Sequence, residues 1–383
     1  MRDTSLLTIS MIGKSGSGKT MMLGGIFDAF VENGVEGKNG AVISATGSLK
    51  DPLFRENDES GIMNGLTVAQ HLAKYKRERT MAVQGRDGKI GKAAAGTVEM
   101  AHIHLDLNVD KPNGEQASLP IKLTDYRGGL LSIDSDRITE TDIGECRAIT
   151  DNLFESEIII VLLDGIMLAQ YRDNAFMRKK KTGADRINVL LNAVMKDSRR
   201  AVTLMLVVTK VDSDKIPDDL KRDNYKELCN LACETVECVY KKSRIMTQSR
   251  DWTFAVVPAT AIGEGNSITQ CVPGSDEYYC AIRNSADVKQ NNIDAVMLYA
   301  VRNALTQRLR LVDKEITQCE RSISDKCRKM NLFNASAVRS FINELSGEKE
   351  DLSDLRNEYS SMLSAMNEEF SGYYEPVRRF GMN

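Results

Sequence analysis

Apolar runs and amphipathic stretches alternate along the first two thirds of the chain. Short apolar or β-branched runs predict strands, and apolar residues three or four positions apart predict helices. Strands are expected at residues 6–12, 41–44, 98–107, 119–124, 158–163, 202–208 and 254–257. Helices are expected at residues 18–31, 67–80, 138–154, 187–196 and 220–240. This alternation predicts an α/β fold with helices on both faces of a sheet.

Two features of the expected strands define the kind of sheet. Residues 158–163 and 202–208 are apolar almost without interruption, which is typical of parallel strands covered on both faces. Residues 98–107 and 119–124 are joined by a segment with Pro-Asn-Gly at 112–114, which predicts an antiparallel hairpin. We therefore expect a mainly parallel sheet with one antiparallel hairpin.

The pattern changes after about residue 285. Apolar residues recur every three or four positions over 293–327 and again over 341–366, which predicts two long amphipathic helices. The short break between them favours an antiparallel helical hairpin. We expect an α/β domain at residues 1–285 and a helical hairpin at residues 286–383. The hairpin either packs on the domain or forms a coiled-coil arm for a partner or a second copy.

Composition narrows the classes of protein to consider. The 383 residues carry a net charge of −3, so charge does not indicate a nucleic-acid partner. No apolar stretch reaches the roughly 18 residues of a membrane span, and the N-terminus lacks the features of a signal peptide. Eight cysteines without a CxxC pair fit a reducing compartment, so we expect a cytoplasmic protein.

The most specific motif lies at residues 13–20, between the first expected strand and the first expected helix. Its sequence, Gly-Lys-Ser-Gly-Ser-Gly-Lys-Thr, matches the phosphate-binding pattern GxxxxGK[ST] at every fixed position. Glycines let backbone N–H groups surround an anion, and the helix N-terminus adds the positive end of its dipole. Lys19 would contact the β- and γ-phosphates, and Thr20 would bind Mg²⁺. The expected phosphate-binding residues are Gly13, Lys14, Ser15, Gly16, Ser17, Gly18, Lys19, Thr20 and Met21.

Three later segments favour guanine over adenine. Residues 125–128 resemble the DxxG element of GTPases, in which Asp125 would hold Mg²⁺ through a water and the Gly128 N–H would contact the γ-phosphate. Residues 209–212 resemble the [NT]KxD element, whose Asp212 carboxylate would accept two hydrogen bonds that guanine donates and adenine cannot. Residues 258–261 resemble the SA[KL] element, whose backbone contacts the guanine oxygen. The expected guanine-binding residues are Thr209, Lys210, Asp212, Ala259, Thr260 and Ala261.

In this order, these elements resemble those of the TRAFAC class of P-loop GTPases, and the loop at 13–20 is similar to that of bacterial Ras-like and double-GTPase proteins. The resemblance covers roughly residues 5–265. It implies a P-loop NTPase fold, with GTP or GDP and Mg²⁺ as ligands. It also implies a molecular switch read by an effector or regulatory protein, in which the γ-phosphate orders residues 84–96 and 125–134.

Departures from the family pattern concern hydrolysis and the metal. Gly129 stands where Ras-like proteins usually carry the glutamine that orients water, so slow or partner-assisted hydrolysis is expected. Arg127 is a candidate catalytic residue beside Lys19 and Gly128, although a solvated or ion-paired arginine is the alternative. Thr97 is the first choice for the remaining Mg²⁺ ligand, and Thr80 is the second.

Two other functions remain open at this point. Asp164 follows the apolar run at 158–163, and if it were the magnesium carboxylate the protein would be an ATP-dependent ATPase or kinase. Alternatively, the nucleotide is a permanent part of an assembly or scaffold protein. The basic run at 178–181 is expected to form a solvated loop.

Overall fold

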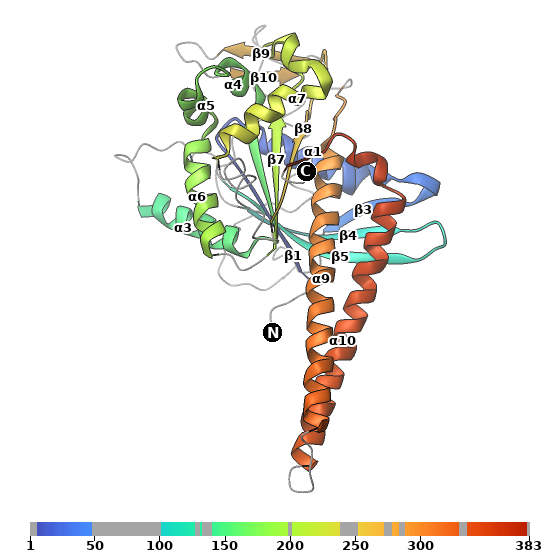
Figure 1. Ribbon diagram of the computed structural model, residues 1–383. Coiled ribbons are helices and arrows are strands. Elements are labelled where there is room, and N and C mark those ends of the chain that lie inside the picture. Colours follow the sequence, from blue (N-terminus) through green and yellow to red (C-terminus); the bar gives the residue numbers. More distant parts are fainter. Residues whose placement is uncertain are drawn as a thin grey trace, which may run out of the picture.

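The computed structural model describes residues 6–47, 101–126, 131, 140–197, 201–237, 252–271, 278–282, 288–328 and 335–380. Its centre is a nine-stranded sheet with the order β11-β8-β7-β6-β1-β5-β4-β3-β2 (Figure 1). The strands are β1 (Leu7–Gly13), β2 (Val35–Glu36), β3 (Val42–Gly47), β4 (Ala101–Asp110), β5 (Gln116–Asp125), β6 (Ile158–Asp164), β7 (Val202–Thr209), β8 (Trp252–Pro258) and β11 (Arg378–Phe380). The helix and loop expected at 67–80 and 84–96 lie outside the described residues.

The five central strands, β5, β1, β6, β7 and β8, are parallel neighbours. The expected hairpin forms from β4 and β5, with Ala101 paired to Asp125. The predicted α/β class and mainly parallel sheet are therefore confirmed. The antiparallel part is larger than one hairpin, because β3 and β2 extend the sheet beyond β4 and β11 pairs antiparallel with β8.

Helices cover both faces of this sheet. They are α1 (Lys19–Phe27), α3 (Glu140–Glu155), α4 (Gly165–Gln170), α5 (Ala175–Thr182), α6 (Ala184–Asp197), α7 (Asp218–Thr235), α9 (Ile293–Arg328) and α10 (Ala335–Glu368). On β6, Ile160 and Leu162 belong to the core that includes α1 and α9, whereas Ile159 and Val161 belong to the core that includes α3, α6 and α7. Figure 1 shows α3 and α6 to the left of the sheet and α9 to its right. Because alternate side chains of β6 enter the two cores, both faces of the strand are buried, and this explains its continuous apolar run.

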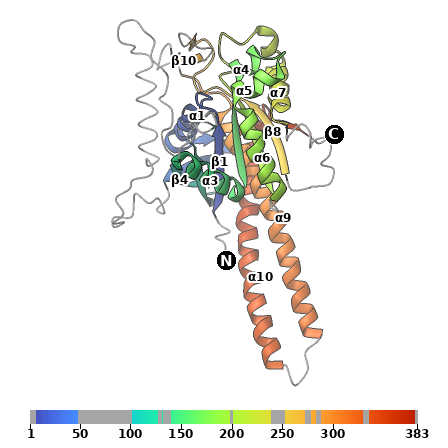
Figure 2. The same ribbon diagram turned by 90° about the vertical axis from the view of Figure 1, so that its left-hand side faces the viewer.

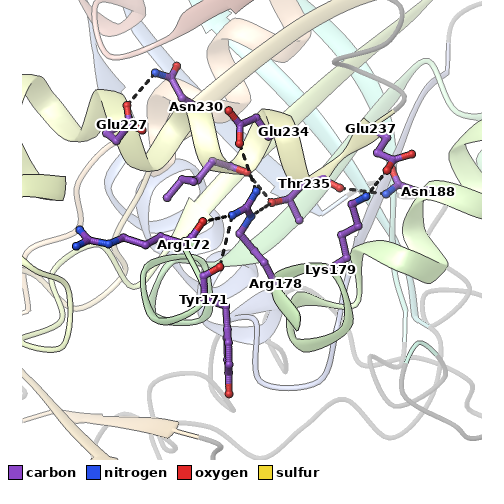
Figure 3. Close-up of polar contacts among 11 residues, drawn as sticks. Tyr171, Arg172, Arg178, Lys179, Asn188, Glu227, Asn230, Glu234, Thr235 and Glu237 are labelled. Carbon is purple, nitrogen blue, oxygen red and sulfur yellow. Dashed lines mark hydrogen bonds and ion pairs between the residues drawn. The ribbon is translucent and has the colours of Figure 1, made fainter. Parts of the chain in front are cut away.

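The basic run at 178–181 is not a solvated loop, so that prediction is wrong. These residues lie in α5, and Arg178 is only 4% exposed. Figure 3 shows the Arg178 guanidinium between α7 and the chain just before α5. Its Nε donates to the Thr235 hydroxyl at 2.8 Å, and its Nη2 pairs with the Glu234 carboxylate at 3.3 Å. Lys179 pairs with Glu237. The run therefore joins α5 to α7 and its C-terminal end, because α7 supplies acceptors that a local sequence pattern does not show.

The C-terminal helices pack against the sheet at one end and project beyond it at the other. The first part of α9 is buried in the core against the sheet, for example at Val296 and Leu305, and the last part of α10 is buried at Met362 and Met366. Figures 1 and 2 show the two helices side by side, projecting well beyond the sheet. Within the described stretches 320–328 and 336–358, no residue is fully buried. The hairpin thus has a packed root and a projecting end.

No helix in the described part of the chain is both long and apolar enough to cross a bilayer.

The root of the hairpin is anchored by Arg308 of α9, which is 7% exposed. Its guanidinium binds both carboxylate oxygens of Glu157, at 2.7 and 2.5 Å. It also donates to the Tyr359 hydroxyl of α10 at 2.8 Å and to the Leu6 carbonyl at 2.7 Å. Charge-assisted bidentate pairs of this kind are strong and directional. One side chain therefore joins α9 and α10 to the residues that precede β1 and β6.

We predict that Arg308→Ala lowers the free energy of unfolding by about 3 kcal/mol, because it leaves the half-buried Glu157 carboxylate unpaired. Urea unfolding followed by circular dichroism measures the change.

The matched control is Arg356→Ala on the same hairpin. Arg356 pairs with Asp313, and both side chains are about half exposed, so a loss below about 1 kcal/mol is expected. Equal losses for the two variants would contradict the assignment of Arg308 as the anchor.

Candidate functional site

The carboxyl ends of the five parallel strands meet at one edge of the sheet. Gly13 ends β1, Asp125 ends β5, Asp164 ends β6, Thr209 ends β7 and Pro258 ends β8. In open α/β sheets, ligands bind outside this edge. The structure therefore brings together the segments that the sequence singled out, although they are as much as 245 positions apart (13 to 258).

The phosphate-loop residues form a tight turn between β1 and α1. Gly16 and Gly18 have φ angles of +79° and +94°, and Gly18 is the N-cap of α1. Residues with a Cβ rarely adopt this left-handed conformation, which explains glycine at both positions. The Ser17 N–H donates to the Lys14 carbonyl at 3.1 Å and closes the turn. Ser15 and Gly16 are exposed, so the loop is open to solvent at its tip.

Lys19 of α1 is buried against this loop, with 6% of its surface exposed. Its Nζ donates to the carbonyl oxygens of Gly13 and Lys14, at 2.7 and 3.2 Å. Burial lowers the pKa of Lys19 from 10.5 to about 8, and the Asp125 carboxylate opposes part of this shift. A buried ammonium held by carbonyl dipoles gains from an added anion. This arrangement fits a bound phosphate.

Asp125 is 1% exposed and pairs in register with Met11 of β1, beside the phosphate loop. Thr20 lies one residue into α1 and is half-buried. Carboxylate and hydroxyl oxygens are the donors that Mg²⁺ prefers, so these two residues fit the metal that the loop motif implies. The remaining expected residues of this part of the site, Thr97, Thr80, Arg127, Gly128 and Gly129, lie outside the described residues.

Thr209 links the phosphate loop to the segment expected to bind the base. Its hydroxyl lies 2.6 Å from the Ser17 carbonyl oxygen and 3.2 Å from the Leu163 carbonyl oxygen, and it donates to this pair. The Thr209 side chain is 7% exposed. Its hydroxyl therefore joins the end of β7 to the backbone of the residue 13–20 loop and to the end of β6.

Asp212 is 8% exposed and already engaged by its neighbours. One oxygen accepts from the Gly263 N–H at 3.1 Å. Burial raises the pKa of Asp212, whereas hydrogen bonds from the Thr260 hydroxyl and the Gly263 N–H oppose the rise. A carboxylate has room for about four hydrogen bonds, so acceptor positions remain for a base. Gly263 was missed from the sequence, because it lies beyond the recognisable element and carries no side chain.

The backbone N–H groups of residues 258–261, the third segment expected to bind guanine, differ in their hydrogen bonding. The Ala259 N–H donates to the Val208 carbonyl at 2.8 Å, and the Thr260 N–H donates to the Asn291 carbonyl at 3.1 Å. The Ala261 N–H makes no hydrogen bond within the described residues.

The residues just before α9 also belong to this region, and sequence reasoning missed them. Asn291 and Thr260 exchange two backbone hydrogen bonds, and the Asn292 side chain donates to the Pro258 carbonyl at 2.8 Å. The Gln290 side chain donates to the Asp28 carboxylate, next to the end of α1, at 3.0 Å. The root of the hairpin therefore contacts the segments that follow both β8 and α1.

Asp164 contacts the start of α4 and Lys210, which belongs to the segment expected to bind the base. Its Oδ1 accepts from the backbone N–H groups of Ile166 and Met167, at 2.9 and 3.3 Å, which caps α4. Its Oδ2 forms an ion pair with the Lys210 ammonium. Asp164, the alternative to Asp125 as the magnesium carboxylate, therefore has a protein partner at each of its two oxygens.

Comparison with known proteins gives little beyond this geometry. No protein-family model matches the chain, and no curated protein matches it. A chain of the solved signal recognition particle receptor SRb-GTP/SRX complex from Chaetomium thermophilum is similar, with 15% sequence identity and a TM-score of 0.37 over 68% of this chain and 93% of that chain. A likeness this distant carries no argument about ligands or partners.

The lowered pKa of Lys19 predicts how the stability of the ligand-free protein varies with pH. Between pH 8 and 10.5 the unfolded chain holds a proton on Lys19 that the folded protein has released. The free energy of unfolding should therefore rise with pH across this window, by about 3 kcal/mol at most. Lys19→Met removes this group, so its stability relative to wild type should be greatest below pH 8 and should fall towards pH 10.5.

Urea unfolding of both proteins at constant ionic strength tests this expectation. A difference between them that stays constant across the pH range would contradict it.

Proposed function

We propose that this protein is a guanine-nucleotide-binding switch that takes GTP or GDP with Mg²⁺. The observation that carries the proposal is the hydrogen bond from the Thr209 hydroxyl to the Ser17 carbonyl. It joins the phosphate loop to the segment that carries Asp212 at one sheet edge. The loop offers donors for phosphate oxygens, and the buried carboxylate offers acceptors for guanine N–H groups.

The proposed roles follow from the chemistry of each group. Lys19 and the loop backbone bind the β- and γ-phosphates. Thr20, Thr97 and Asp125 would hold Mg²⁺, which would neutralise phosphate charge. Asp212 accepts hydrogen bonds from guanine. The capping and ion-pair contacts of Asp164 favour Asp125 as the magnesium carboxylate, and this supports a GTPase over an ATPase or kinase.

We propose slow or partner-assisted hydrolysis, because Gly129 has no side chain to orient water. Arg127 and Gly128 are the candidate residues beside the γ-phosphate. The projecting end of α9 and α10, in the hairpin region 286–383, is the proposed contact for an effector or a second copy, and the α/β domain at 1–285 is the proposed nucleotide-binding unit. We propose the cytoplasm as its location on the cysteine pattern.

Base preference is the first test. We expect wild-type protein to prefer GDP over ADP by at least about a hundredfold. Asp212→Asn should lose most of this preference, because its NH2 group replaces one of the two oxygens that accept hydrogen bonds from guanine. Titration with fluorescent nucleotides and competition by GDP and ADP measure it. Nucleotide released from freshly purified protein identifies the natural ligand.

Two control variants accompany this test. Asp214→Asn changes an exposed acid two positions away and should behave as wild type. Lys19→Met should remove binding of every nucleotide. A wild-type preference for ADP, or an unchanged preference in Asp212→Asn, would refute the guanine assignment.

Turnover separates a switch from a permanently bound nucleotide. Release of phosphate from GTP should continue over several turnovers at an order of 10⁻⁴ to 10⁻³ per second. A rate equal to that of Lys19→Met would instead mean that the nucleotide is a fixed structural ligand.

A further inference from the structure

Asp164 lies between the two halves of the proposed nucleotide site. It ends β6, and β6 lies between β1, which leads into the phosphate loop, and β7, which leads into the base element. Its two carboxylate oxygens have different partners. Oδ1 caps α4 through Ile166 and Met167, and Oδ2 pairs with the Lys210 ammonium. The side chains of Asp164 and Lys210 are 11% and 13% exposed, so water screens their attraction only weakly.

Lys210 begins the turn that carries Asp212. Its φ angle is +57°, a left-handed conformation that a residue with a long side chain rarely adopts. The Ser213 N–H donates to the Lys210 carbonyl at 3.1 Å and closes the turn. Asp212 lies inside this turn, so the backbone of Lys210 sets the direction of the Asp212 carboxylate. The ion pair with Asp164 holds the end of the Lys210 side chain at the start of this turn.

We infer that Asp164 is a positioning residue for base recognition: by binding the Lys210 ammonium it holds residues 210–213 in the conformation that presents Asp212 and the Lys210 alkyl stem to the base. This inference rests on the proposed guanine-nucleotide function. It assigns Asp164 to base selection and not to the metal, for which Asp125 is the proposed carboxylate.

Substitutions can separate the two roles of Asp164, which caps α4 and pairs with Lys210. Asn and Ser are good helix N-caps, so Asp164→Asn and Asp164→Ser keep the cap of α4. Asn turns an amide towards the ammonium, and Ser does not reach it. Lys210→Met keeps an apolar stem and removes the ammonium without touching the cap.

The experiment measures GDP and ADP affinity for these variants, with Mg²⁺ and with Mg²⁺ chelated. Asp164→Asn, Asp164→Ser and Lys210→Met should each weaken GDP about tenfold, while ADP binding changes less. The double variant Asp164→Ser with Lys210→Met should be no weaker than Lys210→Met alone, because both remove one interaction. The loss should be equal with and without Mg²⁺.

The control is Asp219→Asn, which removes an exposed pair at 2.7 Å between α7 and Arg172 in the turn between α4 and α5, and it should bind GDP as wild type does. Melting temperatures of the ligand-free variants identify any loss caused by unfolding, and Lys210→Met carries the test if both Asp164 variants are unfolded.

Three outcomes would overturn the inference: wild-type GDP affinity in Lys210→Met or in a folded Asp164 variant, losses that add in the double variant, or a loss that disappears when Mg²⁺ is chelated. The last would make Asp164 the metal carboxylate. A wild-type protein that prefers ADP refutes the proposed function instead, and this is seen before any variant is compared.

Discussion

Burial of the central strands on both faces is the constraint on which the rest of the structure depends. In β6 every residue from Ile158 to Asp164 is buried, and β7 is buried throughout as well. A strand covered on both sides has no solvated face for charged groups. Its ionisable side chains therefore gather at its ends. Glu157 lies just before β6 and anchors the hairpin, while Asp164 lies at the other end and faces the proposed nucleotide site.

Short polar contacts connect the loops at the carboxyl edge into one series. Thr209 binds the phosphate loop, Lys210 binds Asp164, and Asp212 accepts from Gly263. Thr260 then pairs through its backbone with Asn291, which lies just before α9. Elements that follow four different strands are thereby held to one another by side-chain or backbone hydrogen bonds. The start of the projecting hairpin is part of this series, which connects the hairpin directly to the segment proposed to bind the base.

Buried cations show where local sequence patterns fail. Arg178 belongs to a run of four basic residues that looks solvated, yet its guanidinium is buried on acceptors from α7. Arg308 lies in an amphipathic helix at a position that the apolar pattern passes over, and it binds Glu157 151 residues away. In both cases the acceptors come from distant segments. Charge alone cannot tell a solvated arginine from a buried one, since the difference lies in partners that only folding provides.

The sequence by itself determined the α/β class, most strand positions and the two C-terminal helices, because alternation and helical spacing record which faces are buried. It also singled out the phosphate loop, since positive φ at Gly16 and Gly18 demands glycine locally. Only the tertiary structure decided that the Thr209 hydroxyl faces Ser17, that Asp164 pairs with Lys210, and that Asn291 adjoins Thr260. Those contacts join segments that are far apart in the chain, so no local sequence pattern predicts them. They arise from the parallel order of the strands, which brings their carboxyl ends to one edge.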